Sequence, residues 1–270
     1  MNLLSTDSSG TTKYMRSKRL RLLLFFAGLF LAAFISMAAT SYKIEDSFSA
    51  VPKVAVWMAT NLVPDAKSLS RLPKILGKLL ETVLMSVAAS VTAAVAAFFV
   101  SLAGSATTCR QKALMTAARA VASFFRNIPI VAWAMIFLLT FGQSAFTGYI
   151  ALFFASFGFL GRAFIETIDE AAASPVEALR ATGSDYAHII FQAVLPSVLP
   201  QILSWMLYMI ETNIRSAALV GLLTGSGIGF TFSIYYKSLQ YHSASLVVLS
   251  IVAVVLIIEA VSNKLRRIIL

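Results

Sequence analysis

Four charged side chains interrupt or border long uncharged stretches of this sequence, namely Arg126, Glu211, Arg215 and Glu259. Where such a stretch crosses a membrane, a charge at its centre costs about 2.5–3.5 kcal/mol on insertion scales, so it usually pairs with another group or lines a wet cavity. An arginine guanidinium binds carboxylate or phosphate oxygens through two parallel hydrogen bonds. Arg126 and Arg215 are therefore candidates for attracting an anion weakly enough to release it.

Each of these residues also has a structural interpretation. Arg126 can extend its side chain to the cytosolic interface. Arg215 follows Glu211 by four residues, so the two can form an ion pair on one helix face. Glu259 is expected at the inner end of the last membrane span. The candidate translocation path comprises Arg126, Asn127, Pro129, Glu211, Asn213 and Arg215.

A glycine-rich run follows these residues, with candidate gate positions at Gly221, Gly225, Gly227 and Gly229. Glycine in a helix interior costs about 1 kcal/mol relative to alanine, so residues 216–236 are expected to form a broken or re-entrant element. The run lacks the Lys-Ser/Thr pair with which a P-loop holds phosphate and magnesium. Gly225 and Gly229 are also spaced for close helix packing, and that role is compatible with a gate.

Metal, redox and catalytic chemistry have little support in the sequence. His188 and His242 have no second histidine or carboxylate at metal-ligand spacing, and Cys109 is the single cysteine. We therefore expect no metal site, no disulfide within the chain, no catalytic residues and no cofactor bound by this chain.

The elements that position these residues are expected to be apolar helices. Hydrophobic residues form 59% of the 270 residues and charged residues 13%, a composition that indicates an all-α integral membrane protein rather than a soluble domain. A membrane span needs about 20 mostly uncharged residues. Runs of that size occur at residues 22–42, 82–109, 127–161, 186–210, 216–236 and 238–258. The third run divides at Gly142–Gly148 into two spans, one ending near Phe141 and the other at about 147–164.

The positions of lysine and arginine predict the orientation. The N-terminal tail, the loop after the second span and the C-terminus are basic, so all three are expected inside. Two inside termini require an even number of spans, which gives about six if 216–236 does not cross. The predicted segments are a cytoplasmic tail (1–21), a transmembrane helix (22–42), an extracytoplasmic segment (43–77) and a transmembrane domain (78–265).

The basic N-terminus and the high net charge could also indicate a signal peptide and a nucleic-acid partner, but both readings are less favoured. The first apolar run is too long for a usual signal-peptide core and further spans follow it, so we interpret it as a retained signal anchor. The net charge of +10 lies mainly at membrane flanks, which indicates topology and anionic lipid rather than nucleic acid.

The cytosolic loop 165–190 departs from the basic pattern. It is acidic, with Arg180 as its basic residue against Glu166, Asp169, Glu170, Glu177 and Asp185. Topology does not require such a loop, so it is expected to contact a partner; an amphipathic hairpin without a partner is the alternative. Ser174-Pro175 predicts the start of a second short helix, with Ser174 as its N-cap.

One pattern in and after this loop resembles the coupling loop of type I ABC-importer permeases, which reads E-A-A, three residues, G, nine residues, I-x-L-P. Here Glu177-Ala178-Leu179, Gly183 and Leu195-Pro196 keep the spacing, while Leu179 replaces alanine and Ala193 replaces isoleucine. Upstream, Glu170-Ala171-Ala172 spells the triplet literally but has Val176 at the glycine position. The downstream copy is therefore the better match.

Two further motifs narrow the resemblance. Arg126-x-x-Pro129 with Trp133, and Glu211-x-Asn213-x-Arg215 before the glycines, resemble the phosphonate-type (PhnE-like) permeases, whose relatives carry phosphite or hypophosphite. Thr224-Gly225-Ser226 stands where that branch has G-A-G. The resemblance covers roughly residues 75–265.

The resemblance implies a permease in a bacterial plasma (inner) membrane that works with a second copy of itself. It also implies two ABC ATPase subunits, which would bind ATP and magnesium, and an extracytoplasmic substrate-binding protein. The ATPase-coupling residues that it implies are Glu170, Glu177, Ala178, Leu179, Arg180, Gly183, Leu195 and Pro196. An importer for another small solute such as methionine is an alternative of the same class. A secondary transporter that titrates Glu211 or Glu259 is an alternative of a different class.

Overall fold

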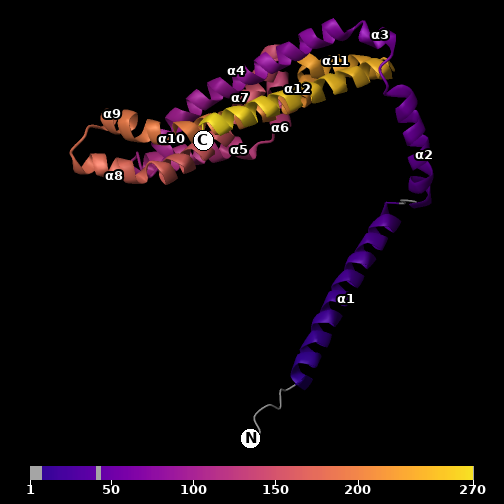
Figure 1. The fold of residues 1–270 in the computed structure, drawn as a ribbon, viewed down its shortest axis with the longest axis horizontal. Coiled ribbons are helices and arrows are strands. Elements are labelled where there is room, and N and C mark those ends of the chain that lie inside the picture. The colour runs from indigo at the N-terminus through magenta and orange to yellow at the C-terminus, as the bar shows by residue number, and fades with distance from the viewer. Residues whose placement is uncertain (1–7, 41–43, 270) are drawn as a thin grey trace. The chain divides into compact units, whose positions relative to one another are not determined.

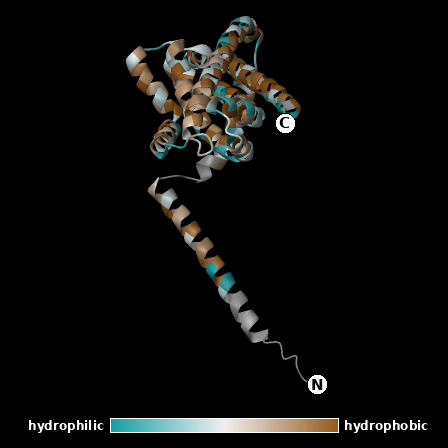
Figure 2. Ribbon diagram, turned by 90° about the vertical axis from the view of Figure 1, so that its left-hand side faces the viewer, coloured by the Kyte–Doolittle hydropathy of each residue, from teal (hydrophilic) through white to brown (hydrophobic). Residues whose placement is uncertain are grey.

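The computed structural model describes residues 8–40 and 44–269, and it divides into two compact units, Met1–Thr60 and Asn61–Leu270. Parts of the predicted segments, at residues 1–7 of the tail and 41–43 between the first two helices, lie outside the described residues. The first unit contains α1 (Ser8–Ala39) and nearly all of α2 (Ile44–Asn61). Within α1, residues 17–39 are long and apolar enough to cross a membrane, and Figure 2 shows brown and pale turns along most of this segment after a teal stretch near the N-terminus.

The second unit is a bundle of helices, seen side by side in Figure 1. Its long helices are α4 (Leu72–Gly104), α7 (Ala145–Ala171), α10 (Leu195–Thr224) and α12 (Tyr241–Ile269). The shorter ones are α3 (Ala66–Leu69), α5 (Lys112–Asn127), α6 (Ile130–Phe141), α8 (Ala173–Ala181), α9 (Tyr186–Ile189) and α11 (Gly227–Lys237). The segment 43–77 thus consists of α2, α3 and the first turns of α4, with residue 43 outside the described part.

The largest core cluster joins α4, α7 and α10. Small residues of α4, such as Ala93 and Ala97, are fully buried against Leu160 and Phe164 of α7. Their small side chains let the two helices approach closely, as is common between membrane helices. Val176 of α8 belongs to the same cluster, so the core extends from the spans to the loop that follows α7.

Among the described residues, five helices are long and apolar enough to cross a membrane, and a bent pair, α5 and α6, would make a sixth. This agrees with the predicted number of about six spans. The third span differs in form from the expectation, because α6 has only 12 residues and meets α5 at 88°. At about 1.5 Å per residue α6 is too short to cross alone. Ile128 has extended backbone and Pro129 has no N–H to donate, which explains the break.

The fifth predicted span is longer than expected and begins with a distortion. Helix α9 continues through a π-helical turn (Ile190–Val194) into α10, which runs on to Thr224 instead of ending near residue 210. Pro196 and Pro200 each remove a backbone donor at the start of α10, so the regular hydrogen-bond ladder is interrupted next to the π-helical turn. The predicted broken element at 216–236 is the end of α10, a reversal at Gly225-Ser226, and α11.

Candidate functional site

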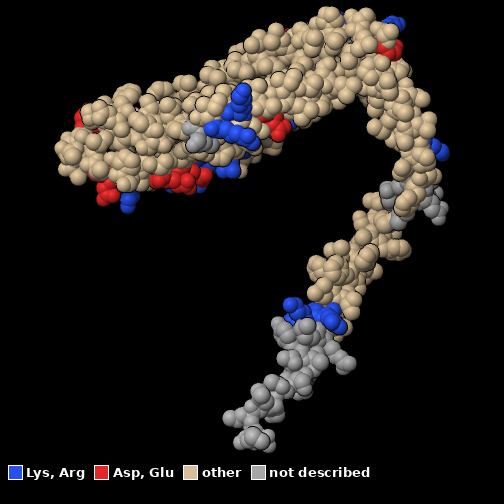
Figure 3. All heavy atoms as spheres, viewed as in Figure 1, with Lys and Arg blue, Asp and Glu red and all other residues tan. Residues whose placement is uncertain are grey.

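The short helix α8 carries four of the eight predicted coupling residues, while Glu170 lies at the end of α7, Gly183 follows α8, and Leu195 and Pro196 begin α10. Glu170, Glu177 and Ala178 are exposed, whereas Leu179 and Arg180 are half-buried. Val176 is 1% exposed and anchors the opposite face of α8 in the core. Acidic side chains gather at this end of the second unit (Figure 3). The helix therefore offers an exposed outer face, which carries the carboxylate of Glu177, from a fixed base, a geometry suited to contact with another protein.

Gly183 ends α8 in a conformation that favours glycine. Its φ angle is +79°, in the left-handed region. The Gly183 N–H donates to the Arg180 carbonyl over 3.0 Å, and the Ser184 N–H donates to the Leu179 carbonyl over 3.2 Å. These two bonds form a Schellman motif, which satisfies carbonyls at a helix end. A Cβ atom at Gly183 would meet nothing within 4 Å, so backbone conformation and not space selects glycine here.

The predicted start of α8 is wrong in detail. The helix begins at Ala173 with Ala172 as its N-cap, and no side chain caps it. Ser174 is the second helical residue instead of the cap. Because α7 extends to Ala171, the two helices follow one another almost directly and leave no room for a capping turn at Ser174.

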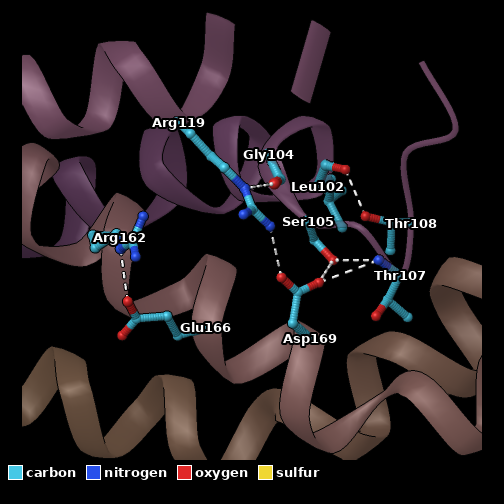
Figure 4. Close-up of polar contacts among 9 residues, drawn as sticks. All are labelled: Leu102, Gly104, Ser105, Thr107, Thr108, Arg119, Arg162, Glu166 and Asp169. Atoms are coloured by element: carbon cyan, nitrogen blue, oxygen red, sulfur yellow. Dashed lines mark hydrogen bonds and ion pairs between the residues drawn. The ribbon is translucent and has the colours of Figure 1, made fainter. Parts of the chain in front are cut away.

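Asp169, near the end of α7, forms a polar hub that no sequence motif indicated (Figure 4). Its carboxylate accepts hydrogen bonds from the Ser105 hydroxyl (2.5 Å) and the Thr107 N–H (3.2 Å) and pairs with Arg119 at 2.9 Å. The Arg119 Nε also donates to the Gly104 carbonyl over 2.7 Å. The end of α7, the turn after α4 and the first half of α5 are thereby joined through one carboxylate.

Arg180 joins α8 to the same turn, because its guanidinium donates to the Thr107 carbonyl over 2.7 Å. Asp169 and Arg180 thus contact Thr107 through its N–H and its carbonyl respectively. Little in the sequence indicated this hub. Asp169 was identified only as one of several acidic residues in its loop, and nothing in the sequence pairs it with Arg119, 50 residues away. The hub connects the candidate coupling loop to the segment between α4 and α5.

Arg126 lies at the bend between α5 and α6, against the middle of α7. A Cβ on Gly158 would fall 2.3 Å from the Arg126 backbone nitrogen, so the two backbones touch.

The Arg126 side chain is exposed, and its guanidinium lies 6.0 Å from the centre of the Phe159 ring. No ion pair to Arg126 occurs among the described residues, whereas Arg162, one turn further along α7, pairs with Glu166. Asn127 is also exposed and bonds only its own helix, at the Ser123 carbonyl.

Glu211 forms two ion pairs rather than one. It lies 3.0 Å from Arg215, as the structural interpretation of the sequence expected, and 3.8 Å from Arg266 of α12. The Glu211 residue is 8% exposed, while the Arg215 side chain is 49% exposed. In the sequence, Arg266 was one of the basic residues that place the C-terminus inside, and no partner was expected for it. One carboxylate between two guanidinium groups leaves a net positive cluster with one cation facing outward.

Asn213 is placed differently from the other candidate path residues. It is 1% exposed, and its amide donates to Ser90 of α4 over 2.8 Å and to Ser156 of α7 over 2.6 Å. In this structure Asn213 therefore fastens three helices together inside the core. Its assignment to the translocation path stays a prediction, for which this conformation gives no support.

Aromatic contacts connect the exposed arginines on one surface. Tyr208, Glu211 and Arg215 share one face of α10, since they are spaced by three and four residues. Phe159 packs on Tyr208 with ring centres 5.6 Å apart and also lies beside Arg126. Arg126 and Arg215 therefore lie along a basic and aromatic surface formed by the α5–α6 bend, α7 and α10.

The candidate gate glycines permit a tight reversal between α10 and α11. Gly225 and Gly227 have φ angles of +67° and +61°. A Cβ on Gly229 would lie 1.9 Å from the Ala218 carbonyl oxygen, and one on Gly221 would lie 2.4 Å from the Ser226 carbonyl oxygen. The reversal is attached to α4, because Thr82 accepts a hydrogen bond from the Ile228 N–H over 2.8 Å. Close packing thus accounts for these glycines, and a gating role stays a prediction.

A conservative change at Glu211 separates a structural carboxylate from a proton-carrying one. We expect Glu211→Gln to retain ATP-driven uptake within about threefold, because an amide can still accept a hydrogen bond from Arg215. Thermal stability should fall modestly, since the ion pairs with Arg215 and Arg266 are lost. Uptake assays and melting curves in detergent would measure the two effects. Complete loss of uptake in a stably folded variant would instead indicate an essential titrating group.

Within the described part of the chain, no group of three or more His, Cys, Asp or Glu side chains could hold a metal ion. Neither His188 nor His242 belongs to such a group, and the His242 Nδ1 lies 2.6 Å from the Val63 carbonyl oxygen. That the chain binds no cofactor stays a prediction.

Residues 101–269 match the family model described as "Binding-protein-dependent transport system inner membrane component". The phosphite transport system permease protein PtxC of Stutzerimonas stutzeri is 29% identical over 217 residues, which is 80% of this chain and 78% of that protein. The phosphate-import permease protein PhnE of Mycolicibacterium smegmatis is 32% identical over 163 residues, 60% of this chain and 31% of that protein.

The solved structures that resemble this fold include inward-facing conformations of the MetNI methionine ABC transporter. The similarity has a TM-score of 0.60 at 18% sequence identity and covers 73% of this chain and 98% of that chain. At this identity the likeness concerns the fold alone, and it supports the all-α polytopic architecture described above.

Proposed function

Because the chain belongs to the family of binding-protein-dependent transport system inner membrane components, we propose that it is the membrane-spanning subunit of an ATP-driven importer of phosphorus oxyanions. It is a multi-pass protein of the bacterial inner membrane and a transport subunit rather than an enzyme. The observation that most supports ATP coupling is the geometry of α8. Its outer face, with Glu177 and Ala178, is exposed, its opposite face is anchored in the core, and Gly183 fixes its end.

The proposed substrates are phosphite, phosphonate or a related phosphate ester or hypophosphite. This assignment rests on the names of the relatives, which include permeases for phosphite and phosphate, and on the chemistry of the basic surface. Arg126, Arg215 and Arg266 against Glu211 give that surface a net positive charge. Guanidinium groups suit tetrahedral oxyanions, which they bind with paired hydrogen bonds.

In the proposed assembly two copies of this chain form the pathway at their shared interface. Two ATPase subunits, which hold ATP and magnesium, contact α8, and an extracytoplasmic binding protein delivers the substrate. Closure of the ATPases moves α8, and the Asp169 hub passes that movement to the turn between α4 and α5. The spans then alternate between inward-open and outward-open states.

Competition for uptake would test the substrate class. Vesicles containing this chain, its genomically neighbouring ATPase and ATP would be given labelled phosphite with the neighbouring binding protein outside. We expect unlabelled phosphite or 2-aminoethylphosphonate to reduce the labelled uptake, and methionine to have no effect. ATP-dependent uptake of methionine but not of phosphite would overturn the oxyanion assignment while leaving the importer intact.

Arg126 gives a separate prediction about the path. We expect Arg126→Gln to lower the rate of phosphite uptake by about five- to tenfold, because it removes one cation from the basic surface. Arg162→Gln is the matched control, since Arg162 is half-buried and already paired with Glu166, and it should change uptake less than about twofold. Equal effects of the two substitutions would assign Arg126 to the membrane interface instead of the path.

A further inference from the structure

A cavity of about 840 Å³ lies beside the coupling loop, outside the basic surface described above. Three segments form it: the last turns of α4, the turn that leads into α5, and the turn from α8 to α9. Its wall includes Arg180 and Gly183 but neither Glu177 nor Ala178, so it lies apart from the exposed outer face of α8. Its volume is in the range of ordinary small-molecule sites.

The wall of this cavity is divided between apolar and cationic residues. Phe99, Leu102 and Leu114 form the apolar part, and Arg110 and Arg180 are the charged residues. None of the 13 lining residues is a carboxylate. The Asp169 carboxylate nearby is already occupied by Arg119, Ser105 and Thr107, and Asp185 follows the wall residue Ser184 without lining the cavity. The site therefore favours an anion attached to an apolar group.

The position of the cavity indicates where such a ligand comes from. Phe99, on the membrane-crossing helix α4, is 67% exposed, and Phe191, just after α9, is 68% exposed. Large apolar side chains with this exposure are suited to contact with lipid chains rather than water. Arg110 follows the end of α4 by six residues and is exposed, as expected at the level of lipid headgroups. The cavity thus lies where the inner leaflet meets the cytosol.

We propose that this cavity binds an anionic phospholipid of the inner leaflet. Arg110 and Arg180 contact the phosphate, and an acyl chain lies along Phe99 and Leu114. Basic pockets between membrane helices on the cytoplasmic side bind anionic headgroups in this way. One Arg180 N–H is used by the Thr107 carbonyl, and the guanidinium has further donors for a phosphate. The lipid connects α8 to the turn before α5, so its presence stiffens the coupling loop.

The single cysteine provides a direct test, because Cys109 lines this cavity. The full chain would be reconstituted in phosphatidylcholine vesicles with or without phosphatidylglycerol, and the rate of Cys109 modification by the uncharged reagent N-ethylmaleimide would be measured. We expect phosphatidylglycerol to slow modification about fivefold, and Arg110→Gln to remove most of that protection. Lys112→Gln is the matched control: it removes an exposed cation two residues away that does not line the cavity, and protection should persist.

Two further measurements show whether lipid, free phosphate or the ATPase subunit protects Cys109 from modification. Inorganic phosphate at millimolar concentration in phosphatidylcholine vesicles should not protect Cys109, because it lacks the apolar group. Equal rates with and without phosphatidylglycerol would overturn the proposal, as would protection that survives Arg110→Gln. Protection by the ATPase subunit alone, with no effect of lipid, would also overturn it and assign the cavity to the protein interface. The readout needs no transport, so its failure is distinct from failure of the proposed function.

Discussion

Gly183→Val is expected to reduce ATP-driven uptake at least about tenfold while the chain still assembles in the membrane. The φ angle of +79° at Gly183 is costly for a β-branched residue, by about 1–3 kcal/mol. Relief of that strain requires the end of α8 to unwind, which breaks the bonds from Gly183 and Ser184 to the helix carbonyls. The outer face of α8 then loses its fixed position. Uptake per folded molecule, measured in ATP-loaded vesicles, would report the effect.

Gly183→Asn is the matched control at the same position. Asparagine tolerates the left-handed conformation, and a new Cβ meets nothing within 4 Å. We therefore expect Gly183→Asn to retain most of the uptake. If asparagine and valine were equally harmful, the glycine would be needed for contact with a partner rather than for its backbone conformation.

Asp169→Ala has the second large expected effect, on both stability and coupling. It removes the acceptor for Ser105, Thr107 and Arg119 at once. Hydrogen bonds to a charged group contribute about 1.5–3 kcal/mol, and the Asp169 side chain is 28% exposed, which reduces the benefit. We expect a lower melting temperature in detergent, and uptake that falls more than binding of the ATPase does.

Glu166→Ala, three residues earlier on α7, tests whether this effect belongs to the hub. Glu166 pairs with Arg162 over 2.6 Å, but the two side chains are 54% and 37% exposed. Such surface pairs contribute about 0–1 kcal/mol, so stability and uptake should change little. Comparable losses in Glu166→Ala and Asp169→Ala would mean that general acidity of the loop matters and not the connection to the turn after α4.

The membrane architecture could be predicted from the sequence because it depends on composition and on runs of uncharged residues. The break between α5 and α6 was not predicted as a bend. Pro129 marks the break, but nothing local in the sequence gives its 88° angle or the close approach of the junction to Gly158. Similarly, Pro196 and Pro200 mark an interruption near the start of α10, although only the structure shows that residues 190–194 form a π-helical turn.

The candidate site was predictable where residues are close in sequence and not where they are distant. Glu211 and Arg215 are four residues apart, and their ion pair was one of the two roles expected for Arg215. Arg266 and Asp169 find their partners 55 and 50 residues away, and no local pattern encodes such pairs. For Asn213 the motif predicted a residue of the translocation path. The sequence did not predict its buried hydrogen bonds to Ser90 and Ser156, which come from two other helices.

Two matched vesicle assays, one with ATP and no ion gradient and one with a proton or sodium gradient and no ATP, separate ATP-driven import from gradient-driven transport. The vesicles would contain this chain with its neighbouring ATPase, with the neighbouring binding protein and labelled 2-aminoethylphosphonate or phosphite outside. We predict uptake that requires ATP inside the vesicles and is lost in Gly183→Val but retained in Glu211→Gln. Uptake driven by a proton or sodium gradient without ATP, together with failure of any ATPase to co-purify with the chain, would show that the chain is not an ATP-coupled permease.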